Sequence, residues 1–191
     1  MNAYFLNILY ICLIILFFYV MYFFYNLENY LFIRPHFLQT NEFIKLNKLL
    51  KNIHHFQENK EKKYIYLDSK QYRKIYKLIY ENIYLKKYIA DTFNSVLKYP
   101  SKPIEYRIYK ENKNSMDWHQ DIQYVNQNYL ECILVLNNTC NCRFQYFKKY
   151  KINSIVQKEN DLILLQPKDL IHTIGPIQNG SKEILKFIIE L

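Results

Sequence analysis

The sequence is poor in glycine and has no positive charge at its start. Only two of its 191 residues are glycine, and no lysine or arginine precedes Arg34. A secretory signal peptide has a basic start and a cleavage site of small residues, and both are absent here. These absences argue against a cleaved signal peptide.

Cysteine is also scarce. Besides Cys12, which lies in the first apolar run, the chain contains only Cys132, Cys140 and Cys142. Cys140 and Cys142 are too close in sequence for an ordinary unstrained disulfide, and one such pair alone does not make a zinc site. We therefore expect reduced thiols, which favours a domain that faces the cytosol.

The most apolar part of the chain is its beginning. Residues 8–25 contain no charged residue and no amide, and the apolar stretch extends back to residue 3. About 20 such residues span a bilayer as a helix, and the tyrosines near both ends suit the membrane interface. We expect a transmembrane anchor over residues 1–25, with residues 3–25 in the lipid bilayer. The alternative is an apolar helix buried in the domain.

Positive charge follows this anchor, beginning at Arg34, and the net charge of the chain is +9. The positive-inside rule then predicts a single-pass membrane protein with a cytosolic C-terminal domain, and a lumenal domain is the alternative. A basic balance can also indicate nucleic acid or an acidic substrate. A lysine-rich domain beside an anionic membrane explains the charge better, and no basic stripe interleaved with aromatics stands out.

The rest of the chain predicts a linker over 26–39 and one domain over 40–191. Apolar residues at helical spacing indicate helices from Thr40 to about Ile53 and over about 70–98, with a short strand near 65–67 between them. After Pro103 the sequence pattern changes to about eight short apolar runs separated by polar turns. These runs cover 104–110, 119–125, 130–137, 143–147, 152–157, 161–166, 170–174 and 183–191.

Helices followed by a series of strands indicate an α+β or mainly β fold. The short strands suit a sandwich or jelly roll. We expect support helices over 40–99 and a jelly-roll core over 104–191, preceded by one transmembrane helix.

The strongest chemical signal is the pair His119 and Asp121, which is followed by His172 later in the chain. Residues two apart on a strand point to the same face, so both side chains can share one metal ion. A second histidine from a neighbouring strand would close a set of two histidines and one carboxylate, which suits non-haem Fe(II) and leaves positions open. Alone, a His-x-Asp pair is as readily a surface pair, and His172 could be an ordinary core histidine.

Two lysines follow His172 in the last predicted strand. Lys182 comes just after Gly180, and a buried cation there could pair with a substrate carboxylate. Lys186 is the second candidate for this role. The alternative for Lys182 is an ordinary solvated lysine in a lysine-rich chain.

The order of these residues resembles that of the 2-oxoglutarate and Fe(II)-dependent dioxygenases. The likeness is greatest to the prolyl 4-hydroxylase branch. The stretch His172-Thr-Ile-Gly-Pro-Ile-Gln-Asn-Gly-Ser-Lys182 is similar to the distal-histidine signature of that branch, and Asp161-Leu-Ile-Leu-Leu to the strand before it. The segments 116–121 and 131–137 also resemble uncharacterised superfamily members of large DNA viruses. The likeness covers about 104–191. It implies a double-stranded β-helix, which is another name for this jelly roll.

The resemblance also implies residue roles. His119, Asp121 and His172 would be the catalytic metal ligands for Fe(II), and Lys182 would bind the far carboxylate of the cofactor 2-oxoglutarate. Tyr109 matches a tyrosine that hydrogen-bonds the same carboxylate, with Tyr106 as a competitor. Ascorbate would be a candidate reductant. One departure is the sequence near 138–144, where Asn-Thr-Cys-Asn-Cys-Arg replaces an expected glycine-rich stretch and puts the substrate groove in doubt.

Three functions follow from this reading. The first is a membrane-anchored dioxygenase that hydroxylates prolyl or lysyl side chains of a protein substrate. The second is a nucleic-acid demethylase or hydroxylase of the same superfamily. The third is a non-catalytic jelly-roll membrane protein, against which the complete set of ligands and Lys182 argue.

Overall fold

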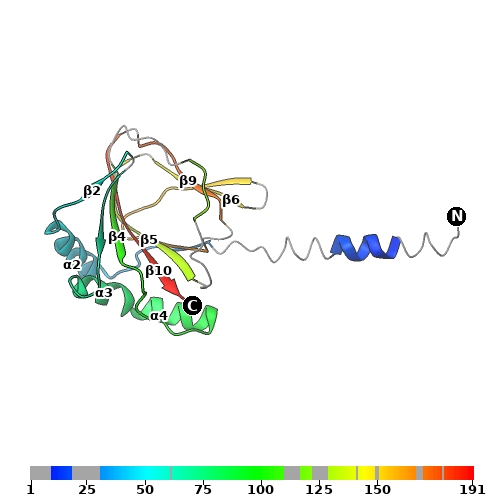
Figure 1. Ribbon diagram of the computed structural model, residues 1–191, viewed down its shortest axis with the longest axis horizontal. Helices are drawn as coiled ribbons and strands as arrows, with labels where there is room; N and C mark the ends of the chain where they lie inside the picture. Colours follow the sequence, from blue (N-terminus) through cyan, green and yellow to red (C-terminus); the bar gives the residue numbers. More distant parts are fainter. Residues whose placement is uncertain are drawn as a thin grey trace.

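The computed structural model describes residues 10–18, 31–60, 62–109, 117–121, 129–140, 142–148, 151–166, 170–177 and 179–191. Two β-sheets and a group of helices form the folded domain (Figure 1). In chain order the elements after residue 30 are β1 Leu31–Arg34, α2 Thr40–Lys51, β2 Gln57–Glu58, β3 Lys63–Leu67, α3 Arg73–Tyr80, α4 Ile83–Phe93, β4 Ile104–Tyr109, β5 Tyr129–Asn138, β6 Phe144–Lys148, β7 Lys151–Ile155, β8 Leu162–Leu165, β9 His172–Ile174 and β10 Lys182–Glu190.

The sheets are antiparallel and of unequal size. The larger has the strand order β1-β8-β5-β10-β4-β3-β2, and the smaller has the order β7-β6-β9. The central neighbours in the larger sheet are distant in sequence, since β10 lies between β4 and β5. This arrangement is an α+β jelly roll with helical support, as the sequence predicts.

Alternation along the central strands creates two apolar cores. On β10, Leu185, Phe187 and Ile189 point to the core shared with the helices. Ile184 belongs to the second core, which also contains residues of the smaller sheet such as Phe144. Because successive side chains of a strand point to opposite faces, Lys182 and Lys186 share the inner face with Ile184. Both lysines therefore lie inside the jelly roll.

Helices α2, α3 and α4 lie together beside the larger sheet in Figure 1. The long helix expected over 70–98 is instead two helices, because Asn82 starts a new one. Its side chain accepts hydrogen bonds from the backbone amides of Tyr84 and Leu85, which caps α4. Asn94 then ends α4 in a left-handed conformation (φ 48°). The prediction of one helix is wrong at this point.

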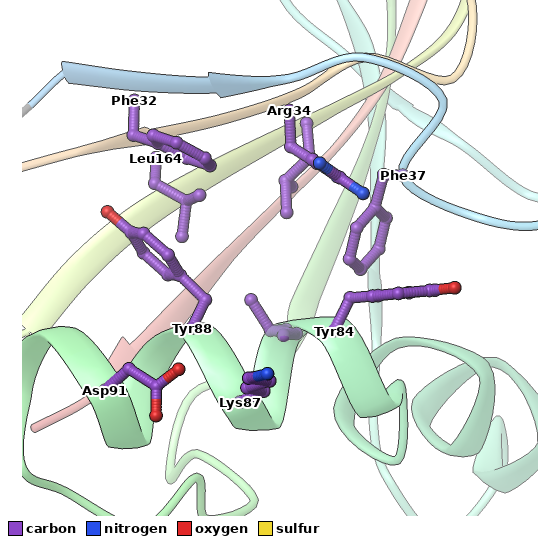
Figure 2. Close-up of a pocket in the computed structure, with 10 residues that line it drawn as sticks. Phe32, Arg34, Phe37, Tyr84, Lys87, Tyr88, Asp91 and Leu164 are labelled. Carbon is purple, nitrogen blue, oxygen red and sulfur yellow. The ribbon is translucent and has the colours of Figure 1, made fainter.

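The first strand was not predicted. Residues 31–34, expected within a linker, form β1 and pair with β8 at the edge of the larger sheet. Phe32 stacks on Tyr88 of α4 with 4.5 Å between ring centroids, and the Arg34 guanidinium lies 5.6 Å from the Tyr84 ring centroid. A cavity of about 220 Å³ lies between this edge and α4 (Figure 2). The linker expectation over 26–39 is therefore wrong for these residues.

Most of the other predicted strands are present within one or two residues of their expected bounds. The run expected over 119–125 is described only as far as Asp121, and His119 forms an isolated bridge there. In the apolar N-terminal part, residues 10–18 are helical. None of the helices in the described part of the chain is long and apolar enough to span a membrane. The transmembrane helix stays a prediction.

Candidate metal centre and cofactor pocket

The structure brings His119, Asp121 and His172 together. The backbones of the two histidines form a bridge, in which the His119 amide donates to the His172 carbonyl (3.0 Å) and the His172 amide donates back (2.9 Å). The two ring centroids are 4.4 Å apart. One ligand atom from each of the three residues lies within 4.8 Å of the others, which is the spacing of a metal site.

The hydrogen bonds of the rings leave the ligand nitrogens available. His119 Nδ1 lies 2.7 Å from the Asp117 carbonyl oxygen, and His172 Nδ1 lies 3.0 Å from that of Leu170. A carbonyl oxygen only accepts, so Nδ1 of each ring carries a proton, and in the neutral imidazole this leaves a lone pair on Nε2. Metal-binding histidines are typically oriented in this way.

The carboxylate also fits a metal ion. Asp121 Oδ2 is buried, receives no hydrogen bond from the described residues and lies 3.3 Å from His172 Nε2. Burial raises the pKa of Asp121, but Lys186, a hydrogen bond with Glu131 and His172 outweigh burial and lower it to about 2. Burial lowers the pKa of His172, which favours the neutral imidazole. Two neutral imidazoles and one carboxylate are the donor set of non-haem Fe(II) sites.

An apolar wall supports the distal histidine. Phe144 of β6 is fully buried and stacks on the His172 ring with 5.3 Å between centroids. The register of β6 and β9 pairs Tyr146 with His172. The small sheet therefore fixes the His172 ring from behind as well as through its backbone.

Lys182 lies at the start of β10 and is 0% exposed. Its ammonium donates to the side-chain oxygen of Gln157, and among the described residues no carboxylate forms an ion pair with it. Burial lowers the pKa of Lys182 to about 7. Gln157 Nε2 is also buried, and within the described part of the chain it has no hydrogen-bond partner. A buried cation beside an unpaired amide donor fits a ligand carboxylate, such as that of 2-oxoglutarate.

Tyr109 lies directly opposite Lys182, since β4 and β10 pair these two residues. Tyr109 is buried in the inner core, and its hydroxyl accepts a hydrogen bond from Arg107 Nη1 (3.3 Å). Tyr106 lies on the other face, where its hydroxyl donates to Glu183 (2.6 Å). Of the two tyrosines, only Tyr109 shares the inner face with Lys182.

Lys186 is occupied differently from Lys182. Its ammonium lies 3.1 Å from Asp121 Oδ1 and 2.6 Å from Glu131 Oε1. Burial lowers the pKa of Lys186, but Glu131 and Asp121 outweigh it, so the pKa is raised. A lysine already held by two carboxylates is a poor anchor for a third, and this favours Lys182 over Lys186 as the residue for 2-oxoglutarate.

A charged cleft of about 420 Å³ adjoins the metal centre. Its lining includes Asp121, Glu131 and Lys186, together with Glu105 and Arg107 of β4. Glu105 is bound by Arg107 Nη2 (2.5 Å) and by Lys62 Nζ (2.9 Å). Sequence reasoning missed Glu105, Arg107 and Glu131. Alternation of polar and apolar residues on β4 and β5 ordinarily predicts that the polar ones face solvent, so their inward position could not be predicted from the sequence.

Gly180 shapes the approach to Lys182. Its φ of 86° is left-handed, and a Cβ there would lie 2.7 Å from the Thr139 carbonyl oxygen. Only glycine adopts this backbone without strain in so little space. The turn before β10 therefore requires one of the two glycines of the chain.

Cys140 and Cys142 form a disulfide. The expectation of reduced thiols is wrong for this pair, because their Cα atoms lie 5.2 Å apart, a distance that a disulfide bridges. Cys132 is a free, buried thiol, and burial raises its pKa. The argument from thiols for a cytosolic domain therefore no longer applies.

Solved structures that match this fold include prolyl hydroxylases and other oxygenases. A Trichoplax adhaerens prolyl hydroxylase, in complex with a hypoxia inducible factor peptide fragment, aligns with a TM-score of 0.67 at 12% identity, covering 86% of this chain and 84% of that one. A Pseudomonas putida prolyl-4-hydroxylase aligns with a TM-score of 0.67 at 11% identity, covering 85% and 92%. A viral collagen prolyl hydroxylase of Paramecium Bursaria Chlorella virus-1, in its 2-oxoglutarate complex, aligns with a TM-score of 0.62 at 16% identity, covering 86% and 98%.

Comparison of the sequence with models of known protein families finds no match, and neither does comparison with curated proteins. At the identities above, structural likeness defines the fold. The fold is that of the 2-oxoglutarate and Fe(II)-dependent oxygenases, with prolyl 4-hydroxylases among its structural neighbours, and it carries a candidate His-x-Asp…His facial triad. The expected jelly-roll fold is thereby confirmed, and Fe(II) and 2-oxoglutarate are the cofactors typical of oxygenases with this fold.

Proposed function

We propose that this chain is an Fe(II)- and 2-oxoglutarate-dependent dioxygenase that hydroxylates a prolyl or lysyl side chain of a protein. The observation that carries the proposal is the pairing of two features inside one jelly roll. The triad of His119, Asp121 and His172 presents three metal ligands, and Lys182 is a buried cation with no carboxylate partner among the described residues.

The residues divide the work as follows. His119, Asp121 and His172 would hold the metal, and Lys182 with Tyr109 would hold the far carboxylate of 2-oxoglutarate. Bound iron and 2-oxoglutarate supply the oxidation, in which O₂ is consumed, succinate and CO₂ are released, and one oxygen atom enters a substrate C–H bond. Burial of His172 and Lys182 limits water on that side of the site, and the strands fix the orientation of these two groups.

A protein substrate is supported by the neighbours named above, one of which holds a peptide and several of which are prolyl hydroxylases. The cleft on the Asp121 side of the triad offers space next to the site for part of such a substrate. Proline-rich and lysine-rich peptide pools, analysed for a mass increase of one oxygen atom, would distinguish the two residue types.

The first test is an anaerobic titration of the full chain with Fe(II) and 2-oxoglutarate, followed by the visible metal-to-ligand charge-transfer band. The proposal expects a band in the wild-type protein, no band in His119→Ala, and a need for far more 2-oxoglutarate in Lys182→Ala. A well-folded wild-type protein without a band would contradict it and would favour a non-catalytic jelly roll.

We also propose that residues 3–25 tether the enzyme to a membrane, with the catalytic domain on the cytosolic side. Support comes from the uncharged run over 8–25 and from the basic residues that follow it.

A further inference from the structure

The two oxygens of Asp121 have different surroundings. Oδ2 faces the triad and lies 3.3 Å from His172 Nε2. Oδ1 accepts a hydrogen bond from Lys186 Nζ at 3.1 Å. One oxygen is thus directed to the metal position, and the other is held by an ammonium group.

Lys186 is held in turn by Glu131, whose Oε1 lies 2.6 Å from its Nζ. Glu131 is 3% exposed, and its strand β5 pairs directly with β10, which carries Lys186. Two central strands of the larger sheet therefore fix the ammonium. Glu105 and Arg107 of β4 lie on the same face beside Lys186, but the groups that contact its ammonium are the carboxylates of Asp121 and Glu131.

Burying this cluster of charged groups costs free energy, so its presence calls for a reason other than stability. Replacing a buried ion pair by apolar residues is often neutral or stabilising, so stability alone is a weak reason for its presence. A hydrogen-bond donor to the non-ligating oxygen of a metal-binding carboxylate has a functional role, because such partners set the orientation of the ligand. The cluster touches a triad residue and does not extend to Lys182.

We infer that Lys186 is a positioning residue for the metal ligand Asp121, with Glu131 fixing its ammonium group. By binding Oδ1, Lys186 leaves Oδ2 as the single oxygen that Asp121 offers to the metal. Ligation through one oxygen keeps open the positions that 2-oxoglutarate and O₂ require in a facial triad. The inference rests on the proposed function, because it assigns a role within the same metal site.

The test uses the double variant Lys186→Met/Glu131→Gln in the full chain. It removes one positive and one negative charge together, so the net charge near the metal is preserved. Titration of the metal-free protein with Co(II), followed by its visible spectrum, reports both affinity and coordination. Loss of a partner to a metal ligand typically weakens metal affinity by about 10- to 100-fold, and we expect that loss together with a changed Co(II) spectrum.

The matched control is Lys63→Met/Glu58→Gln, which removes a pair of the same charges at the surface, where the two groups are 3.5 Å apart. We expect unchanged Co(II) binding in this control. Unchanged Co(II) affinity and spectrum in a folded Lys186→Met/Glu131→Gln protein would overturn the inference and would make the cluster merely structural. Absence of Co(II) binding in the wild-type protein would instead contradict the proposed function.

A second measurement does not depend on the variant being able to fold. A crystal structure of the wild-type protein with Co(II) and 2-oxoglutarate should show Asp121 bound through Oδ2 alone, with Oδ1 still on Lys186. Ligation through both oxygens, or an Oδ1 turned away from Lys186, would overturn the inference.

Discussion

At the scale of single residues, the triad could be predicted because two of its members are two apart in sequence and the third lies in a separate predicted strand. His119 and Asp121 are two apart, and His172 faces them through a backbone bridge. The partners of the triad could not be predicted, because they depend on which strands are neighbours. Glu131 and Lys186 are charged residues in separate apolar strands, and only the pairing of β5 with β10 brings them to Asp121.

Replacing Asp121 by alanine removes one of three metal ligands as well as the partner of Lys186. We expect 2-oxoglutarate turnover to fall to background, which is more than the roughly 10- to 100-fold loss typical of a partner outside the ligand set. Succinate formation is the measurement. Asp91→Ala, at an exposed position on α4, is the control and should retain full activity. Turnover that survives in Asp121→Ala and stays coupled to substrate would remove Asp121 from the ligand set.

The pKa of Lys182 predicts a pH dependence of 2-oxoglutarate binding. Burial lowers this pKa to about 7, and a bound carboxylate would raise it again. Above pH 7 the free protein has lost the proton that the complex keeps, so binding takes up a proton and affinity decreases with rising pH. The decrease is at most about tenfold per pH unit, and calorimetry with the Ni(II)-loaded protein between pH 7 and 9 measures it.

The control for this pH dependence is Lys182→Arg, since arginine stays protonated throughout this range. Its 2-oxoglutarate affinity should vary much less between pH 7 and 9 than that of the wild-type protein. Parallel pH profiles of the two proteins would show that Lys182 is not the titrating group.

At the scale of elements, the strands were easier to predict than their boundaries and partners. The apolar runs that form β4, β5, β8 and β10 are strands with apolar side chains on both faces, between the two cores. The strand β1 could not be predicted because four residues are too few to show a clear alternation of apolar and polar side chains. It forms because it pairs with β8, more than 120 positions later in the sequence. The break between α3 and α4 had a readable signal in Asn82, a favoured capping residue.

The turn that leads into β10 offers a test at this scale. Gly180→Ala would place a Cβ 2.7 Å from the Thr139 carbonyl oxygen at a φ of 86°. Such strain costs on the order of 1–3 kcal/mol, so we expect the free energy of unfolding to fall by about that amount. Since Lys182 follows this turn, 2-oxoglutarate affinity should fall as well. Urea denaturation and calorimetry measure the two effects.

The other glycine of the chain is the matched control. A Cβ at Gly175 would lie 3.8 Å from its nearest neighbours, which is ordinary contact. Gly175→Ala should therefore leave the free energy of unfolding within about 1 kcal/mol of the wild-type value. Equal effects at both glycines would show that the conformation at Gly180 is not what the turn requires.

At the scale of the whole molecule, two properties bear on where the enzyme acts. The net charge is +9, and the apolar run over 8–25 precedes the domain. Either could bring the protein to a membrane, but the physical mechanisms differ. Attraction of a basic surface to anionic lipid is screened by salt, whereas burial of an apolar helix in the bilayer is not.

The predicted anchor can be tested by membrane fractionation of the full chain. We expect the protein to stay with the membrane pellet after washes with 1 M salt and with alkaline carbonate. An apolar segment of about 20 residues is held by the hydrocarbon core and not by surface charge. Leu13→Lys/Leu16→Lys introduces charges into the run and should release the chain, because a lysine at the centre of a membrane helix costs about 2.5–3.5 kcal/mol. Release of the wild-type chain by salt alone would instead assign its membrane binding to the basic surface.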